Sequence, residues 1–150
     1  MMSALLYLRV MSFEEKRSWI YAAIAVVVPL VYTIVMLRRL DGTDAADVAY
    51  IRPLITAVVA AMVLNIAANI VAGMFSRRED VDRKDERDRQ IHRLGEYVGF
   101  YVMSLAALVP LVLAMAEVDY FWIANALYLA FCLAALGSAA AKIVAYRRGF

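Results

Sequence analysis

Three side chains able to share a metal ion lie in the most charged part of the chain. Asp88, His92 and Glu96 are spaced four residues apart, so on an α-helix they share one face. Two carboxylates and an imidazole are ordinary ligands of a divalent cation. However, His92 is the only histidine, and one helix face rarely completes a coordination sphere. We therefore favour ion pairing of His92 with the two carboxylates, expect no cofactor, and retain a divalent metal here as the less favoured hypothesis.

A stripe of small and amide side chains forms a second candidate site. It repeats every four residues and comprises Ala57, Ala61, Asn65, Asn69 and Gly73. Small residues let helix backbones approach closely, and amides form hydrogen bonds between helices. Asn125 and Ser138 lie on a face of the last apolar segment that could pack against this stripe. Asn65, Asn69, Asn125 and Ser138 thus either bond helices together or line a polar cavity. The first reading is favoured, because no ionisable residue lies deep in any apolar segment.

A dense mixture of acidic and basic residues fills positions 76–96. Opposite charges at four-residue spacing, such as Asp85 and Arg89, favour a helix over the latter half of this insert. Alternating charge outside the membrane is a surface that a soluble protein can reach. The residues that we predict to bind such a partner are Lys84, Asp85, Glu86, Arg87, Asp88 and Arg89.

Motifs of the common enzyme classes are missing. The chain has no nucleophile elbow, glycine-rich phosphate loop, H-E-x-x-H or C-x-x-C motif. Cys132 is the only cysteine, so no intramolecular disulfide can form. The formal net charge of +2 is too small to indicate direct nucleic-acid binding. We therefore predict a protein that is not an enzyme.

Four apolar stretches must position these residues. They cover about 18–37, 53–75, 97–116 and 120–144. About 20 apolar residues in a helix cross the hydrocarbon core of a bilayer, so each stretch is long enough to span it. The sequence predicts an all-α, polytopic membrane protein of one domain, with two antiparallel transmembrane hairpins. The third helix is expected to extend beyond the membrane into the charged insert.

Basic residues orient the predicted helices. The segment before the first stretch, the insert and the C-terminal end from Lys142 onward hold 13 of the 16 lysines and arginines. With four crossings these three segments lie on the same side of the membrane. Basic residues concentrate in the cytoplasmic segments of membrane proteins. We therefore expect a multi-pass protein of the cell membrane, with both termini and the insert in the cytoplasm.

The charged motif also carries a family resemblance. The stretch K-D-E-R-D at 84–88, before an aromatic-rich helix, resembles that of a family of uncharacterised prokaryotic membrane proteins with four helices. The starting F-E-E-K-R-S-W at 13–19 and the ending A-Y-R-R-G at 145–149 are similar to those of actinobacterial members. The similarity covers nearly the whole chain from Met11. Genes of this family often lie beside genes for helix-turn-helix regulators, which implies a membrane sensor or anchor for a cytoplasmic regulator.

Two functions remain open from the sequence. The first is a regulatory, sensor or scaffolding protein, expected as a homodimer in the lipid bilayer and acting through its charged insert. The alternative is a small transporter or channel with a polar path along Asn65 and Asn69. The amide stripe and several acidic residues in the outer loops motivate that alternative.

Overall fold

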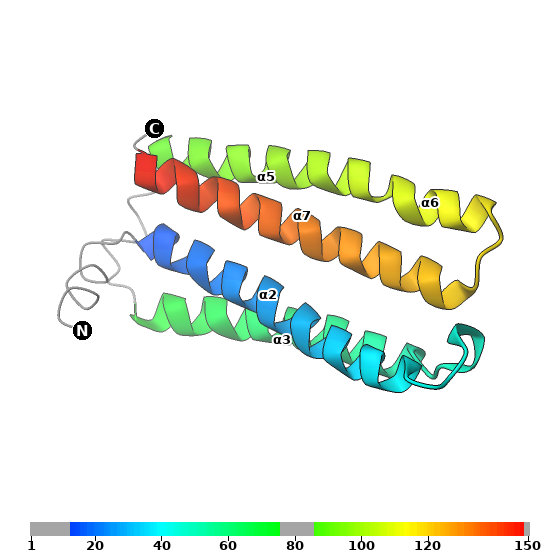
Figure 1. Cartoon of the computed structure of the whole chain (residues 1–150). Coiled ribbons are helices and arrows are strands. Elements are labelled where there is room, and N and C mark those ends of the chain that lie inside the picture. Colours follow the sequence, from blue (N-terminus) through cyan, green and yellow to red (C-terminus); the bar gives the residue numbers. More distant parts are fainter. Residues whose placement is uncertain (1–12, 76–85, 149–150) are drawn as a thin grey trace.

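The computed structural model describes residues 13–75 and 86–148 of the chain (Figure 1). These residues form helices and short connections, with no strand among them. The prediction of an all-α fold is confirmed. Two of the residues predicted to bind a partner, Lys84 and Asp85, lie outside the described residues.

Four helical segments are long and apolar enough to cross a membrane, as predicted. The helices are α2 (Phe13–Leu40), α3 (Ile51–Phe75), α5 (Glu86–Ala106), α6 (Leu108–Met115) and α7 (Tyr120–Arg148). Helices α5 and α6 together make one candidate span of 30 residues, and α7 makes another of 29. This architecture is compatible with an integral membrane protein.

The connection between α2 and α3 is ordered by backbone geometry. Gly42 has φ +78°, a left-handed conformation that glycine adopts without steric cost. The amide of Thr43 donates to the carbonyl of Leu40 at 3.2 Å, which closes the turn after α2. A short 3-10 helix, η1 (Ala45–Asp47), then leads the chain toward α3.

A proline separates α5 from α6 without ending the span. Pro110 has no backbone N–H, so the carbonyl of Ala106 loses the donor that a continuous helix would supply. The amide of Ala107 still donates to Met103 at 2.8 Å, and that of Leu111 donates to Ala107 at 3.3 Å. The interruption is therefore local, and the two helices continue in nearly the same direction (Figure 1).

Helix α7 is the centre of the bundle. It packs against α5, α6 and α2, whereas α3 packs mainly against α2 (Figure 1). The packing order is thus α3, α2, α7, α5. We call the end where α2 and α5 begin and α3 and α7 end the insert end, at the left of Figure 1. The opposite end, where the connections between helices lie, is the loop end.

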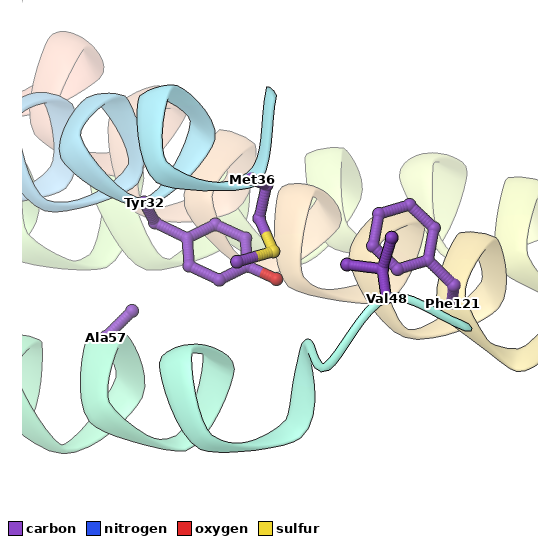
Figure 2. Close-up of a cluster of buried hydrophobic side chains, with 5 residues drawn as sticks. All are labelled: Tyr32, Met36, Val48, Ala57 and Phe121. Carbon is purple, nitrogen blue, oxygen red and sulfur yellow. The ribbon is translucent and has the colours of Figure 1, made fainter. Parts of the chain in front are cut away.

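The main cluster of the buried core lies toward the loop end. It consists of Tyr32, Met36, Val48, Ala57 and Phe121. Other buried side chains, such as Ile91 and Ile143, lie toward the insert end. Figure 2 shows Tyr32 and Met36 projecting from α2 toward α3, and Val48 of the connecting loop beside Phe121 of α7. The α2–α3 loop is therefore part of the packing between α2, α3 and α7. Large apolar side chains elsewhere, such as Leu30 and Leu105, remain exposed, as expected for helices that face lipid.

Glycines bring α5 and α7 close together. A β-carbon on Gly99 would lie 3.2 Å from Cβ of Ser138 and 3.3 Å from the carbonyl of Ala134. A β-carbon on Gly137 of α7 would lie 3.1 Å from Cγ2 of Val102. Close backbone approach increases van der Waals contact, which drives helix association in lipid, where the hydrophobic effect contributes little.

Candidate functional site

A cavity of about 1060 Å³ lies among α2, α3, α5 and α7. Small-molecule sites usually have volumes of about 300–1,000 Å³, so this cavity is large enough for a sizeable ligand. It extends from the insert end toward the middle of the bundle. Helices α3 and α5 both line it, although their main packing partners are α2 and α7 respectively.

The half of the cavity nearer the middle of the bundle is apolar. Its lining includes Pro29 of α2, Met62 of α3 and Phe131 of α7. Tyr128 also lines the cavity, and its ring centroid is 5.0 Å from that of Tyr32 in an edge-to-face arrangement. Because Tyr32 belongs to the buried core, the core bounds the cavity toward the loop end.

The half of the cavity near the insert end is charged. Nζ of Lys142 on α7 lies 2.9 Å from Oε1 of Glu96 on α5. The Lys142 side chain is only 17% exposed, whereas the Glu96 side chain is 63% exposed. Lys142 reaches Glu96 by lying across Gly95, whose missing side chain leaves room for the lysine stem. Nε2 of His92 lies 3.9 Å from Oε1 of Glu96, one turn away on the same helix, and forms the ion pair that the spacing predicts when His92 is protonated.

A second polar contact joins the start of α5 to the end of α7. The hydroxyl of Tyr146 donates to Oδ1 of Asp88 at 3.0 Å. Together with Lys142 and Glu96, this pair fixes the charged turns of α5 against α7 across the insert end.

The geometry bears on the metal hypothesis for Asp88, His92 and Glu96. A helix rises about 1.5 Å per residue, so carboxylates eight residues apart are separated by about 12 Å along the axis and cannot share one ion. Among residues 13–75 and 86–148, no group of three or more His, Cys, Asp or Glu side chains is placed to hold a metal. A metal on this face would need ligands from elsewhere, such as a second copy of the chain.

The predicted polar residues have separate roles. Asn69 accepts a hydrogen bond from the guanidinium of Arg17 and donates one to the hydroxyl of Tyr21, so it links α3 to α2. The hydroxyl of Tyr32 donates to Oδ1 of Asn125 at 2.7 Å and links α2 to α7. Two of the four predicted residues therefore bond helices together.

The other two polar residues, Asn65 and Ser138, line the cavity. Nδ2 of Asn65 donates to the carbonyl of Ala61 at 2.8 Å within α3. Its Oδ1 is buried and receives no hydrogen bond from the residues that the structure describes. Helix α3 packs on α2 rather than on α7 as expected, and α2 supplies Arg17 and Tyr21 as hydrogen-bond partners for Asn69.

The described residues of the predicted partner surface begin α5. Glu86, Arg87 and Arg89 are exposed, and Asp88 is half-buried. Nη1 of Arg89 lies 3.8 Å from Oε2 of Glu86, with both side chains more than 60% exposed. We call Glu86, Arg87 and Arg89 the α5 charged surface.

Sequence reasoning missed four residues at or beside the site. In the sequence, Lys142 and Arg17 counted only as basic residues that orient the helices in the membrane, but both side chains line the cavity. Gly95 and Gly99 form a G-x-x-x-G spacing, a known signal of close helix packing in membranes. That spacing could have indicated where another helix approaches α5.

Comparison with models of known families, with curated proteins and with solved structures finds no match to this chain.

Proposed function

We propose that this chain is a non-enzymatic, regulatory membrane protein that binds a cytoplasmic protein through the α5 charged surface. One observation carries the proposal: the charged turns of α5 continue a membrane-length helix and are fixed to α7. The Tyr146–Asp88 and Lys142–Glu96 contacts hold these turns, while Glu86, Arg87 and Arg89 remain exposed. A charged surface held in fixed geometry favours selective binding of a protein with complementary charge.

The same helix would connect a partner to the cavity. Arg89 of the α5 charged surface lines the cavity, and Ile91 and Glu96 line it within about two further turns of α5. If α5 can adopt two placements relative to the other helices, a ligand that binds more tightly to one of them shifts the equilibrium toward that placement. This arrangement supports a sensor role more than a purely structural one.

We place the insert end in the cytoplasm of the cell, because it holds most of the basic residues. A cysteine introduced in place of Arg87 is then labelled by a membrane-impermeant reagent only in inverted vesicles or lysed cells. Labelling in intact cells would contradict this placement. A homodimer is our working oligomeric state, and the mass of the purified protein in a defined detergent tests it.

Partner binding is tested with matched charge variants. The test variant is Glu86→Gln/Arg87→Gln/Arg89→Gln. The control is Asp41→Asn/Arg38→Gln/Arg52→Gln, which makes the same change in net charge at exposed positions of the loop end. A protein recovered with the wild type is identified, purified and titrated against all three forms. We expect at least tenfold weaker binding to the test variant and unchanged binding to the control; equal binding to all three would reject the proposal.

A small transporter or channel is the second candidate. The specific observation in its favour is Asn65, which lines the cavity with an amide oxygen that lacks a donor among the described residues. Asn69 is engaged by α2, so a polar path would depend on Asn65. Flux of a broad panel of ions and solutes into proteoliposomes tests this function. No flux, or flux that Asn65→Leu leaves unchanged, would count against it.

A further inference from the structure

We propose that the cavity is a binding site for one anionic phospholipid of the surrounding bilayer. The phosphate-bearing headgroup lies among the basic residues of the insert end, and an acyl chain occupies the apolar half. Arg89 belongs to both the cavity lining and the α5 charged surface, but this inference does not depend on whether that surface binds a protein.

The first support is the change of polarity along the cavity. Near the insert end the lining carries charged side chains such as Arg17, Arg93 and Lys142, and toward the middle it becomes apolar at Met62 and Phe131. A ligand that is charged throughout would leave the inner half unfilled, and a wholly apolar ligand would bury the charged half without a partner. A molecule with one charged end and one hydrocarbon end matches both halves.

The second support is the sign of the charge. Four cationic side chains line the cavity, Arg17, Arg89, Arg93 and Lys142, against two carboxylates, Asp88 and Glu96. Arg89 also lies 3.8 Å from Glu86, which is outside the lining, so the positive charges still exceed the negative ones when this pair is counted. Both carboxylates already have partners on α7, the hydroxyl of Tyr146 and the ammonium of Lys142. Arg93 makes no ion pair with any residue that the structure describes. The excess positive charge therefore favours an anionic headgroup over a neutral or cationic one.

The third support is the open side of the bundle. The lining helices pack in the order α3, α2, α7, α5, with extensive contact between each successive pair. Among the described residues, the two outer helices, α3 and α5, have no such extensive contact with each other. The cavity thus has a side toward lipid between α3 and α5, through which an acyl chain can enter from the bilayer without crossing a packed helix interface.

The fourth support is the level of the charged half of the cavity relative to the lipid headgroups. Arg17 and Lys142 lie within a few residues of helix ends at the insert end, close to where headgroups begin. At the same end, Arg147 lies over the Trp19 ring, 5.2 Å from its centroid, and tryptophan concentrates at this level of the bilayer. Basic pockets between transmembrane helices at the headgroup level are typical sites for anionic lipid headgroups. The charged half therefore lies where a phosphate would be.

Binding is measured on the full-length protein in a neutral detergent by native mass spectrometry and by titration. The probes are phosphatidylglycerol, phosphatidylcholine of the same acyl chains, and glycerol 3-phosphate as the soluble headgroup. We expect phosphatidylglycerol to bind at a ratio of one per chain and at least about tenfold more tightly than either other probe. Equal affinity for the two lipids would overturn the charge argument, and tight binding of glycerol 3-phosphate would overturn the lipid in favour of a soluble anion.

Two pairs of variants localise the binding. Arg93→Gln lowers phosphatidylglycerol affinity about fivefold, the effect of one basic residue near an anionic lipid surface, and Arg38→Gln at the loop end does not. Ala135→Phe fills the apolar half from an exposed, cavity-lining position of α7 and weakens binding of the lipid, whereas Ala140→Phe, exposed on the same helix outside the cavity, does not. Phosphatidylglycerol binding that both cavity variants leave unchanged would place the lipid on the outer surface and overturn the proposal.

Discussion

The side chain of Lys142 on α7 lies directly against Gly95 on α5. A β-carbon on Gly95 would lie 2.6 Å from Cγ and 2.9 Å from Cδ of Lys142, and closer still to Cε. The lysine ammonium thereby comes to 2.9 Å from Glu96, one residue further along α5. The ion pair at the charged half of the cavity thus depends on the absence of a side chain in the facing helix.

Replacing Gly95 with alanine tests this dependence. Gly95→Ala forces the Lys142 stem aside and separates the ammonium from Glu96, with a loss of stability of about 1 kcal/mol because a flexible stem rather than a backbone must move. Lys142, only 17% exposed in the wild type, then reacts faster with an amine reagent. Peptide mass spectrometry of the labelled protein measures the rate. Unchanged labelling of Lys142 would contradict the contact.

Gly99 has a stricter requirement for space. Gly99→Leu places a large side chain against Ser138 and the Ala134 backbone, so α5 and α7 must separate along their length. Overpacking of this kind costs about 1–3 kcal/mol. The free energy of unfolding in mixed micelles, from denaturing-detergent titration, measures the loss. Ser104→Leu is the control, since Ser104 is exposed on the same helix; equal losses in both variants would argue against close α5–α7 packing.

The Glu96–Lys142 pair is expected to respond asymmetrically to removal of either partner. Glu96→Gln leaves a mostly buried ammonium without its carboxylate, which costs about 1–3 kcal/mol. Lys142→Met leaves a largely exposed carboxylate that water solvates, so the loss is about 1 kcal/mol or less. The same unfolding titration compares the two variants. A larger loss for Lys142→Met would show that the lysine is better solvated than its burial indicates.

The Tyr32–Asn125 hydrogen bond connects α2 to α7 next to the core. Hydrogen bonds between transmembrane helices contribute about 0.6–2 kcal/mol, so Tyr32→Phe should lose stability in that range. A double-mutant cycle with Asn125→Ala separates the bond from the other contacts of each residue. Tyr101→Phe removes a hydroxyl from an exposed tyrosine of α5 and should have no effect. Additive losses in the cycle would show that the two side chains are not coupled.

Metal binding at Asp88, His92 and Glu96 is directly measurable. We expect the purified protein to contain far less than one metal ion per chain and to bind added zinc no better than His92→Asn. Their spacing along one helix supports this expectation, because the two carboxylates cannot reach one ion. Stoichiometric zinc that is lost in His92→Asn would instead establish a metal site with ligands from a second copy or from beyond the described residues.

The predicted partner surface and the family resemblance stay predictions. Lys84 and Asp85 lie outside the described residues, whereas Glu86, Arg87 and Arg89 are placed on an exposed helical surface. The charge spacing of the insert was enough to predict a helix there, because oppositely charged side chains four residues apart lie together only on a helix. Which protein meets this surface depends on the shape and charge of that partner.

The amides show how far sequence patterns extend in a membrane protein. Their four-residue spacing predicted that they share a helical face, but it did not reveal that Asn69 bonds to α2 and Asn65 faces the cavity. In a water-soluble protein the apolar face of a helix points inward. In lipid both faces are apolar, so the hydrophobic pattern does not distinguish the side toward a neighbouring helix from the side toward acyl chains.

The sequence by itself determined that this chain forms four apolar helices, with a charged insert between the second and the third. Peptide groups in hydrocarbon must bond within their own segment, and this requirement acts on composition and length alone. Only the tertiary structure decided that α7 is central, that Lys142 crosses Gly95, and that the helices leave a cavity charged at one end and apolar at the other. Those features come from steric fit and hydrogen bonding between segments far apart in the chain, which local spacing does not encode.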